Sequence, residues 1–333
     1  MSELPLVSIL VPFYQVERYI ERCARSIFNQ SYQHLEFIFI NDASMDKSLD
    51  ILSGVLLEYP HFSKQTKLVN HSQNQGIAAC RNECIKLCSG DFMTWVDADD
   101  YLEPQAILRM VDCQQKSNAD IVNGNVVEHT EDKKCEYALF PNENREDILV
   151  GLLSFSIRKN LWGRLIRTSL YRDNQICFID GVNYHEDFQV LTRLVYCAKR
   201  VANVDTVIYH YDRQNISSLI TLARKDLGNK LIKDQQDLLS VKVLRSFFSD
   251  KEQPYPKLAN EIVVYYLREI LRDATRAKEK KLFMDTSREL SIIDKQYVQR
   301  YGKSLWIMSR ISPSICWFMK RIRCILLERK NSL

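Results

Sequence analysis

The sequence predicts an α/β protein with a mostly parallel sheet flanked by helices, followed by a helical region. Short apolar runs rich in β-branched residues alternate with helix-period patterns up to about residue 122. Strict alternation of strand and helix is typical of right-handed βαβ units, whose strands are parallel. Beyond about residue 222 the strand patterns stop and long helical periodicities remain.

The expected strands are apolar runs that end at polar or turn-forming residues. The run 6–11 (LVSILV) is stopped by Pro12, and the run 35–40 (LEFIFI) ends at Asn41. Two further runs, 67–69 and 91–96, and a strand that begins at 119 complete the predicted sheet. Helices with apolar residues at helical spacing are expected between these strands at 16–28, 49–59, 77–87 and 104–116.

The composition is that of an ordinary soluble protein. Of the 333 residues, 46% are hydrophobic and 26% are charged. No apolar run is long enough to cross a bilayer as a helix. The N-terminal stretch MSELPLVSIL lacks the basic region of a signal peptide, so we expect a cytoplasmic location.

The ten cysteines include no CxxC pair. Cys80, Cys84 and Cys88 are spaced to lie along one face of an expected helix. A zinc site would need a fourth ligand and usually a closer spacing. We interpret the three as reduced thiols that pack like small apolar groups.

Periodicity and charge divide the chain into three parts: an α/β body (1–221), a helical region (222–302) and a basic tail (303–333). Residues 300–330 hold eight Lys or Arg and one acid, which leaves 38 basic and 41 acidic residues, a net charge of −3, elsewhere. This distribution argues against a nucleic-acid-binding body and gives the tail a separate role.

The tail interleaves aromatic and aliphatic side chains with basic ones. Trp306, Trp317 and Phe318 recur at helical spacing among basic residues such as Lys320 and Arg321. This pattern is typical of a helix that lies on an anionic membrane surface. We therefore predict peripheral binding to the inner face of the plasma membrane; the alternative is a last helix packed on the body.

Three carboxylates follow the strand at 91–96, where ligands bind in sheets of this kind. Asp97 and Asp99 lie two residues apart on an extended segment, so both side chains can point into the same crevice. Such oxygen ligands suit Mg²⁺ or Mn²⁺ bound jointly with a diphosphate. Asp100 has a second interpretation, because with Glu103 it could form a capping box for the next helix.

Five motifs occur in an order that identifies a known family. The chain resembles the family 2 glycosyltransferases of GT-A fold, which include bacterial capsule, lipopolysaccharide and exopolysaccharide enzymes. The motifs are VSILVPFYQ (7–15), NDASMDKS (41–48), NQGIAACRN (74–82), GDFMTWVDADD (90–100) and HEDF (185–188). The resemblance covers about residues 5–220 and divides the body into a nucleotide-sugar-binding half (1–125) and an acceptor-side half (126–221).

The resemblance implies a metal-dependent, inverting hexosyl- or N-acetylhexosaminyltransferase. Its partners would be a nucleotide-sugar donor, most simply a UDP-sugar, and a glycan or lipid-linked acceptor. Its cofactor would be Mn²⁺ or Mg²⁺. The family pattern carries the following residue roles: Pro12, Tyr14, Asn41 and Asp42 at the nucleotide, Arg81 near the donor, Asp97 and Asp99 at the metal, and Asp187 as catalytic base.

Several features leave alternatives open. Gln15, Asn41 and Ala43 depart from the usual family pattern, which leaves the preferred nucleotide undefined. Glu186 and Asp187 could instead be acids that stabilise a helix N-terminus. Other segments align more loosely: Arg164 stands in one that resembles the acceptor side, and His210 in one that resembles a cover over the diphosphate.

The protein classes that compete with a glycosyltransferase are a sugar nucleotidyltransferase, a phosphatase and a non-catalytic nucleotide-sugar-binding partner subunit. A nucleotidyltransferase would need a glycine-rich basic loop after the first strand, which residues 13–22 lack. A phosphatase would carry its acidic pair after the first strand instead of the fourth. The acidic pair and Asp187 speak against a subunit without activity.

Overall fold

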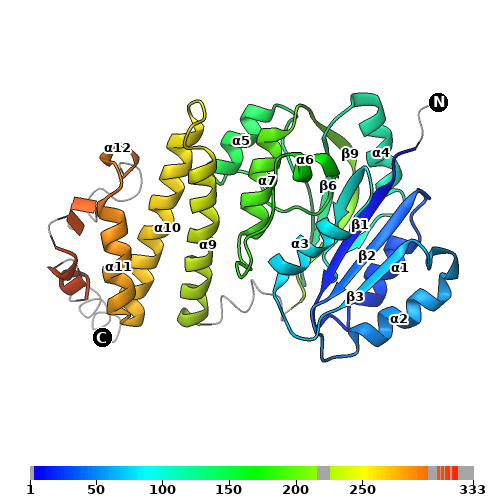
Figure 1. Ribbon diagram of the computed structural model, residues 1–333, viewed down its shortest axis with the longest axis horizontal. Helices are drawn as coiled ribbons and strands as arrows, with labels where there is room; N and C mark the ends of the chain where they lie inside the picture. The colour runs from blue at the N-terminus through cyan, green and yellow to red at the C-terminus, as the bar shows by residue number, and fades with distance from the viewer. Residues whose placement is uncertain are drawn as a thin grey trace. The chain divides into compact units, whose positions relative to one another are not determined.

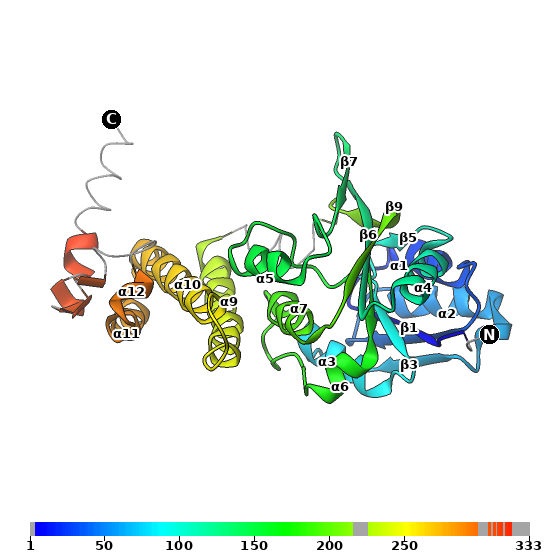
Figure 2. The same ribbon diagram turned by 90° about the horizontal axis from the view of Figure 1, so that it is seen from above.

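The computed structural model describes residues 4–215, 226–298, 306–307, 309–310, 312–315 and 317–321. Contacts divide the chain into two compact units, Met1–Ile216 and Ser217–Leu333. Figures 1 and 2 show the helices and strands of each unit. The division lies near the predicted boundary at residue 221.

The first unit is built on a nine-stranded sheet with the strand order β3-β2-β1-β4-β8-β6-β9-β5, in which β7 pairs with β6. The sheet is parallel from β3 to β4, as predicted, whereas β8 runs antiparallel to both β4 and β6. The strands are β1 Val7–Phe13, β2 Leu35–Asn41, β3 Thr66–Asn70, β4 Phe92–Trp95, β5 Tyr101–Leu102, β6 Ile121–His129, β7 Lys134–Ala138, β8 Arg164–Arg167 and β9 Val201–Asp212.

Helices cover both faces of this sheet. Figure 2 draws α1, α2 and α4 on one side of it and α3, α6 and α7 on the other. The helical elements of this unit are α1 Ile20–Phe28, α2 Ser48–Glu58, η1 Pro60–Phe62, α3 Ile77–Leu87, α4 Ala106–Ser117, α5 Arg145–Leu153, α6 Thr168–Asp173 and α7 Glu186–Cys197. The predicted α/β class is therefore confirmed.

The central strands β1 and β2 are buried along their whole length, as expected for strands covered on both faces. Pro12 was expected to stop the first strand, but β1 continues to Phe13. Leu10 accepts a hydrogen bond from the Val96 amide, so Pro12, two residues later, faces the same side. Pro12 has no N–H to continue the ladder with β4, so that pairing ends at Trp95 while the pairing with β2 continues to Phe13.

The second unit is helical, with α9 Leu227–Phe247, α10 Tyr255–Ala277, α11 Lys280–Ser291 and α12 Lys295–Val298. Helix α10 packs against α9 and α11 through buried residues such as Val263, Leu267 and Ile270. Within the described residues, no helix is long and apolar enough to cross a membrane.

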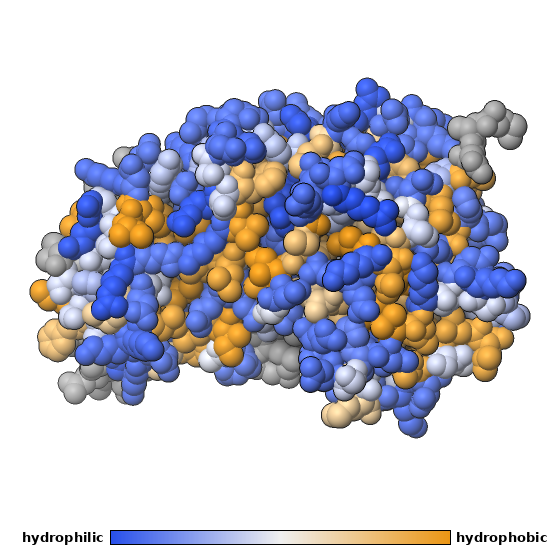
Figure 3. Space-filling view, viewed as in Figure 1, coloured by the Kyte–Doolittle hydropathy of each residue, from blue (hydrophilic) through white to orange (hydrophobic). Residues whose placement is uncertain are grey.

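The described residues of the predicted tail pack on this helical unit. Trp306 is buried and donates a hydrogen bond from its indole to the Ile293 carbonyl at 2.8 Å. The ring of Trp317 lies 5.1 Å from that of Phe283. Four large hydrophobic residues of the described part of the tail are exposed instead: Ile307, Ile315, Phe318 and Met319. Residues 303–305, 308, 311, 316 and 322–333 lie outside the described residues. In Figure 3 hydrophilic residues interrupt the hydrophobic surface of this unit.

Candidate active site

The three carboxylates that follow β4 differ in burial. Asp97 is partly exposed, with 31% of its side-chain surface accessible, whereas Asp100 is completely buried. Asp100 accepts hydrogen bonds from the Tyr209 hydroxyl at 2.7 Å and the Asp212 amide at 2.8 Å. The capping interpretation of Asp100 is therefore wrong. The chain first forms the short strand β5, and the N-cap of α4 is Gln105.

Crowding and burial leave this acidic loop with excess negative charge. Burial first, and the neighbouring Asp97 second, raise the pKa of Asp99 to about 6, although Asn215 donates a hydrogen bond to its carboxylate at 2.8 Å. Burial and the charge of Asp99 raise the pKa of Asp100 well above its usual value. A divalent cation bound here would offset this charge, so the donor set of Asp97 and Asp99 fits the predicted Mg²⁺ or Mn²⁺.

Arg81 joins the acidic loop to a helix far along the sequence. Its guanidinium, on α3 and 3% exposed, donates to Asp97 Oδ1 at 3.1 Å. It also forms ion pairs with Asp187 and, at 3.4 Å, with Glu186. The rings of Trp95 and Phe178 lie 5.5 and 5.6 Å from the guanidinium carbon. The Arg81 guanidinium thus contacts both Asp97, in the predicted metal-binding loop, and Asp187, the predicted base.

Asp187 lies in the first turn of α7, with 17% of its side-chain surface accessible. Its Oδ2 accepts a hydrogen bond from the Leu161 amide at 3.2 Å. Glu186 lies in the same turn, which the helix-terminus interpretation required. The ion pair with Arg81, which also contacts Asp97, places Asp187 beside the acidic loop, and a role at the helix terminus alone does not explain this position.

The predicted nucleotide residues lie at the carboxyl ends of β1 and β2. These ends are adjacent, because Pro12 pairs with Ile40 and Phe13 with Asn41 in the parallel register. Tyr14, directly after β1, is 42% exposed, whereas Asn41 is buried and accepts a hydrogen bond from the Ser44 amide. The structure therefore brings Pro12, Tyr14, Asn41 and Asp42 to one edge of the sheet.

Asp42 organises the loop that precedes α3. Its carboxylate, 3% exposed, accepts hydrogen bonds at 2.8 Å from the amides of Gln75 and Gly76 and from His71 Nδ1. Gly76 has a φ of 88°, and a Cβ there would lie 2.4 Å from the Asn183 side chain. The loop therefore requires glycine at this position.

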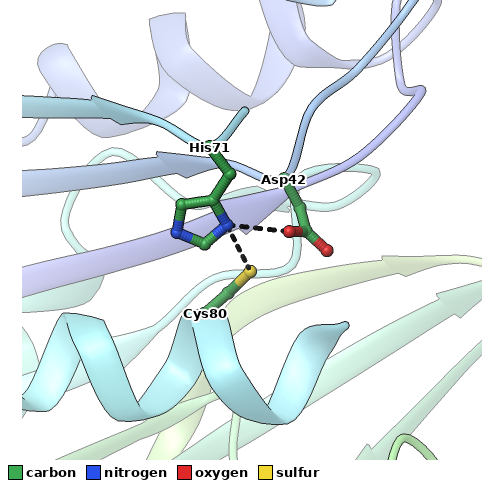
Figure 4. A group of neighbouring side chains, drawn as sticks. All are labelled: Asp42, His71 and Cys80. Carbon is green, nitrogen blue, oxygen red and sulfur yellow. Dashed lines mark hydrogen bonds and ion pairs between the residues drawn. The ribbon is translucent and has the colours of Figure 1, made fainter. Parts of the chain in front are cut away.

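Figure 4 shows His71 between Asp42 and Cys80. Its other nitrogen, Nε2, lies 2.6 Å from Glu83 Oε2. Burial lowers the pKa of His71, but the hydrogen bonds to Glu83 and Asp42 outweigh burial, so the pKa is raised. Cys80 is buried, as are Cys84 and Cys88, and all three are free thiols as predicted.

Tyr209 is a residue whose role the sequence patterns did not predict. Its hydroxyl accepts a hydrogen bond from the Asp97 amide at 3.1 Å and donates to Asp100, so it connects both ends of the acidic loop to β9. Its ring stacks on Trp162 at 4.7 Å. The alternation of Tyr209 and Tyr211 along a strand was the available signal, but the partner of the hydroxyl depends on strand pairing.

Two loosely aligned residues have structural contacts. Arg164 is fully buried, donates to the Asn160 carbonyl at 2.9 Å, and lies over the Phe140 ring. Burial lowers its pKa to about 9. The ring of His210 stacks on Tyr101 at 4.3 Å, and its nitrogens contact the side chains of Glu103 and His129.

Comparison with known proteins finds related glycosyltransferases. The family described as glycosyl transferase family 2 matches residues 8–163. The putative glycosyltransferase EpsH of Bacillus subtilis is 31% identical over 181 residues, which cover 53% of this chain and 51% of that protein. The chain spans about half the length of the curated relatives it matches.

Two solved structures share the fold over almost the whole chain. Residues 1–349 of TarS from S. aureus, in complex with UDP-GlcNAc, give a TM-score of 0.69 at 15% identity and cover 95% of this chain and 90% of that one. The mannosyltransferase PcManGT from Pyrobaculum calidifontis, in complex with GDP-Man and Mn²⁺, gives 0.53 at 17% identity and covers 96% and 88%. The predicted GT-A fold with appended helices is therefore confirmed.

Proposed function

We propose that this chain, whose residues 8–163 match glycosyl transferase family 2, transfers a sugar from a nucleotide-sugar donor to a hydroxyl group of a glycan or lipid-linked acceptor. A UDP-sugar is the proposed donor, and the product would serve cell-surface polysaccharide synthesis. The transfer would invert the configuration of the anomeric carbon.

The contact of Arg81 with both Asp97 and Asp187 carries this proposal. A direct displacement needs a leaving diphosphate on one side of the sugar and a base on the other. Arg81 contacts Asp97, in the loop proposed to bind the diphosphate, and Asp187, the proposed base, so it keeps the two acids close together. Neither a helix cap nor a solvated turn requires that these two acids share a buried cation.

Asp187 is the proposed general base. The Leu161 amide donates a hydrogen bond to its carboxylate and the Arg81 guanidinium forms an ion pair with it, and both contacts orient the carboxylate. An ionised carboxylate can accept the proton of the acceptor hydroxyl while the hydroxyl oxygen attacks the anomeric carbon. Such a base typically contributes ~10²–10⁴-fold to the rate.

Asp97 and Asp99 are the proposed ligands of Mn²⁺ or Mg²⁺, with Asp99 the more direct one. The raised pKa of Asp99 supports this role, because it reports negative charge that the surrounding protein compensates only in part. When bound, the cation would supply Lewis-acid stabilisation of the departing diphosphate. The residues at the ends of β1 and β2, Pro12, Tyr14, Asn41 and Asp42, would contact the nucleotide.

The test is release of nucleoside diphosphate from UDP-, GDP- and dTDP-sugars, measured with Mn²⁺, with Mg²⁺ and with a chelator. We expect metal-dependent release from one donor class, and loss of release in Asp187→Asn. Donor binding without release under any of these conditions would contradict the proposed transfer and favour a non-catalytic partner subunit.

We also propose that the second unit attaches the protein to the cytoplasmic membrane surface. The exposed Phe318 and Met319 adjoin Lys320 and Arg321, which supports contact with anionic lipid. The buried Trp306 is not available for insertion, so these exposed residues would provide the apolar contact.

The membrane proposal is tested by sedimentation of the full chain with phosphatidylcholine vesicles that contain phosphatidylglycerol. Phe318→Ser combined with Met319→Ser should reduce the bound fraction, and high salt should release part of the wild-type protein. Ile292→Ser, at an exposed position of the same unit outside the tail, is the matched control. Equal binding by all three proteins would contradict the proposal.

A further inference from the structure

Three side chains of different ligand types meet at the ends of β2 and β3 and on α3. Asp42 Oδ1, His71 Nδ1 and Cys80 Sγ all lie within 4.8 Å of one another (Figure 4). Among the His, Cys, Asp and Glu side chains of the described residues, this is the one group of three or more that is close enough to hold a metal ion. The acidic loop at 97–100 lies outside this group.

Two of the three distances between the ligand atoms lie near those of a tetrahedral zinc site. The nitrogen of His71 lies 2.8 Å from the oxygen of Asp42 and 4.0 Å from the sulfur of Cys80. With bonds of about 2.0 Å to nitrogen or oxygen and about 2.3 Å to sulfur, tetrahedral ligand pairs lie roughly 3.3–3.5 Å apart. These two pairs would each have to change by roughly half an ångström to hold the ion, and the Asp42 oxygen and the Cys80 sulfur lie within 4.8 Å of each other.

The surroundings of the three ligands orient them. Glu83 contacts the nitrogen of His71 that faces away from the cluster, the arrangement by which carboxylates orient histidine ligands of metals. The Gly76 amide holds the second oxygen of Asp42. The side chains of Asp42 and His71 are each 5% exposed, and Cys80 is 1% exposed.

We propose that Asp42, His71 and Cys80 form a three-ligand site for Zn²⁺, in which Glu83 orients His71 and the fourth coordination position takes water. A thiolate and an imidazole select Zn²⁺ over the hard cations that suit Asp97 and Asp99. The ion replaces the thiol proton of Cys80 and any proton on His71 Nδ1, while the other nitrogen of His71 keeps its contact with Glu83. The protein thus carries a soft cation site separate from its hard one.

The experiment uses Co²⁺ as the spectroscopic probe on the full, reduced chain. We expect one equivalent of Co²⁺ to produce a thiolate-to-cobalt charge-transfer band in the near ultraviolet, which Zn²⁺ then abolishes by displacement. Cys80→Ala should lose this band. Cys84→Ala is the matched control, because Cys84 is a buried thiol one turn along the same helix and outside the cluster.

Two further variants make the test independent of folding defects. Cys80→Ser keeps a small polar side chain, and it should lose the band while its far-ultraviolet circular dichroism stays that of the wild type. Glu83→Gln should keep the band but weaken Zn²⁺ binding by about 10–100-fold. The absence of a band in the wild type, or the same band in Cys80→Ala and Cys80→Ser as in Cys84→Ala, would overturn the proposal.

Discussion

Two acidic sites at the same edge of the sheet, one after β2 and one after β4, have their charge offset in different ways. After β2, the carboxylate of Asp42 accepts three hydrogen bonds from two amides and His71. After β4, Asp97, Asp99 and Asp100 crowd together, and burial raises the pKa of Asp99 to about 6. The first acid organises its own loop and supplies one ligand of the proposed Zn²⁺ site. The second group retains charge that an external cation can offset.

Arg81 connects these two regions, because it follows Cys80 on α3 and reaches Asp97 and Asp187. The positive charge of the Arg81 guanidinium therefore already offsets part of the negative charge of the acidic loop. The comparison predicts that substitutions of Arg81, Asp187 or the acids at 97–100 affect both activity and stability. Substitutions outside this group should affect one of the two properties or neither.

The largest expected effect is that of Asp187→Asn on turnover. Removal of a general base should lower the transfer rate by about 10²–10⁴-fold while donor affinity, measured by calorimetry, stays close to that of the wild type. Glu186→Gln is the control within the same helical turn. A normal rate in Asp187→Asn with a large loss in Glu186→Gln would move the role of base to Glu186.

Arg81→Gln should unfold more easily than the wild type. Loss of the guanidinium leaves Asp97, Glu186 and Asp187 beside a buried neutral group, and breaking such a pair costs about 3–5 kcal/mol in the free energy of unfolding. Urea denaturation measures this cost. Arg25→Gln, which removes an exposed pair with Glu58, should change little. A similar loss of stability in both variants would contradict the claim that the ion pairs of the buried Arg81 stabilise the fold more than an exposed pair.

Asp99→Asn should raise the stability of the protein while it removes the effect of Mn²⁺ on donor binding. Because the folded-state pKa of Asp99 is raised, the folded protein binds more protons than the unfolded chain between about pH 4 and 6. The ionised side chain therefore destabilises the fold as pH rises through this window. The variant should be more stable by about 1–3 kcal/mol at pH 7, and this difference should vanish below about pH 4.

The same variant should lose the enhancement of donor binding by Mn²⁺, measured by calorimetry at pH 7 with and without the ion. Full retention of the Mn²⁺ effect would contradict the assignment of Asp99 as a ligand. If Asp99→Asn were less stable than the wild type at pH 7, the conclusion that the ionised Asp99 side chain destabilises the fold would be wrong.

Tyr209→Phe is expected to have the smallest effect of the series. The variant keeps the stacking on Trp162 but leaves Asp100 without its hydroxyl donor, which should cost about 1–3 kcal/mol. Tyr137→Phe is the control, because the buried hydroxyl of Tyr137 makes no hydrogen bond to the described residues. Equal stability of the two variants would remove Tyr209 from the support of the acidic loop.

Local patterns predicted the elements that depend on neighbours in sequence. The apolar spacing at 77–87 matches helix α3, Ile77–Leu87, because the face of a helix repeats within a few residues. The polar residues at strand ends were placed correctly at one edge of the sheet, since the carboxyl ends of parallel strands coincide.

Local sequence patterns were enough to predict the α/β class and the acidic residues on which the proposed chemistry depends. Only the tertiary structure decided which partners those residues meet. Asp100 binds Tyr209 instead of capping α4, because β5 pairs with β9 and brings that hydroxyl to the loop. Arg81 links Asp97 to Asp187, and Cys80 approaches His71, through the packing of α3. Hydrogen bonds and ion pairs depend on distances of a few ångströms, and for side chains far apart in sequence only the folded chain sets those distances.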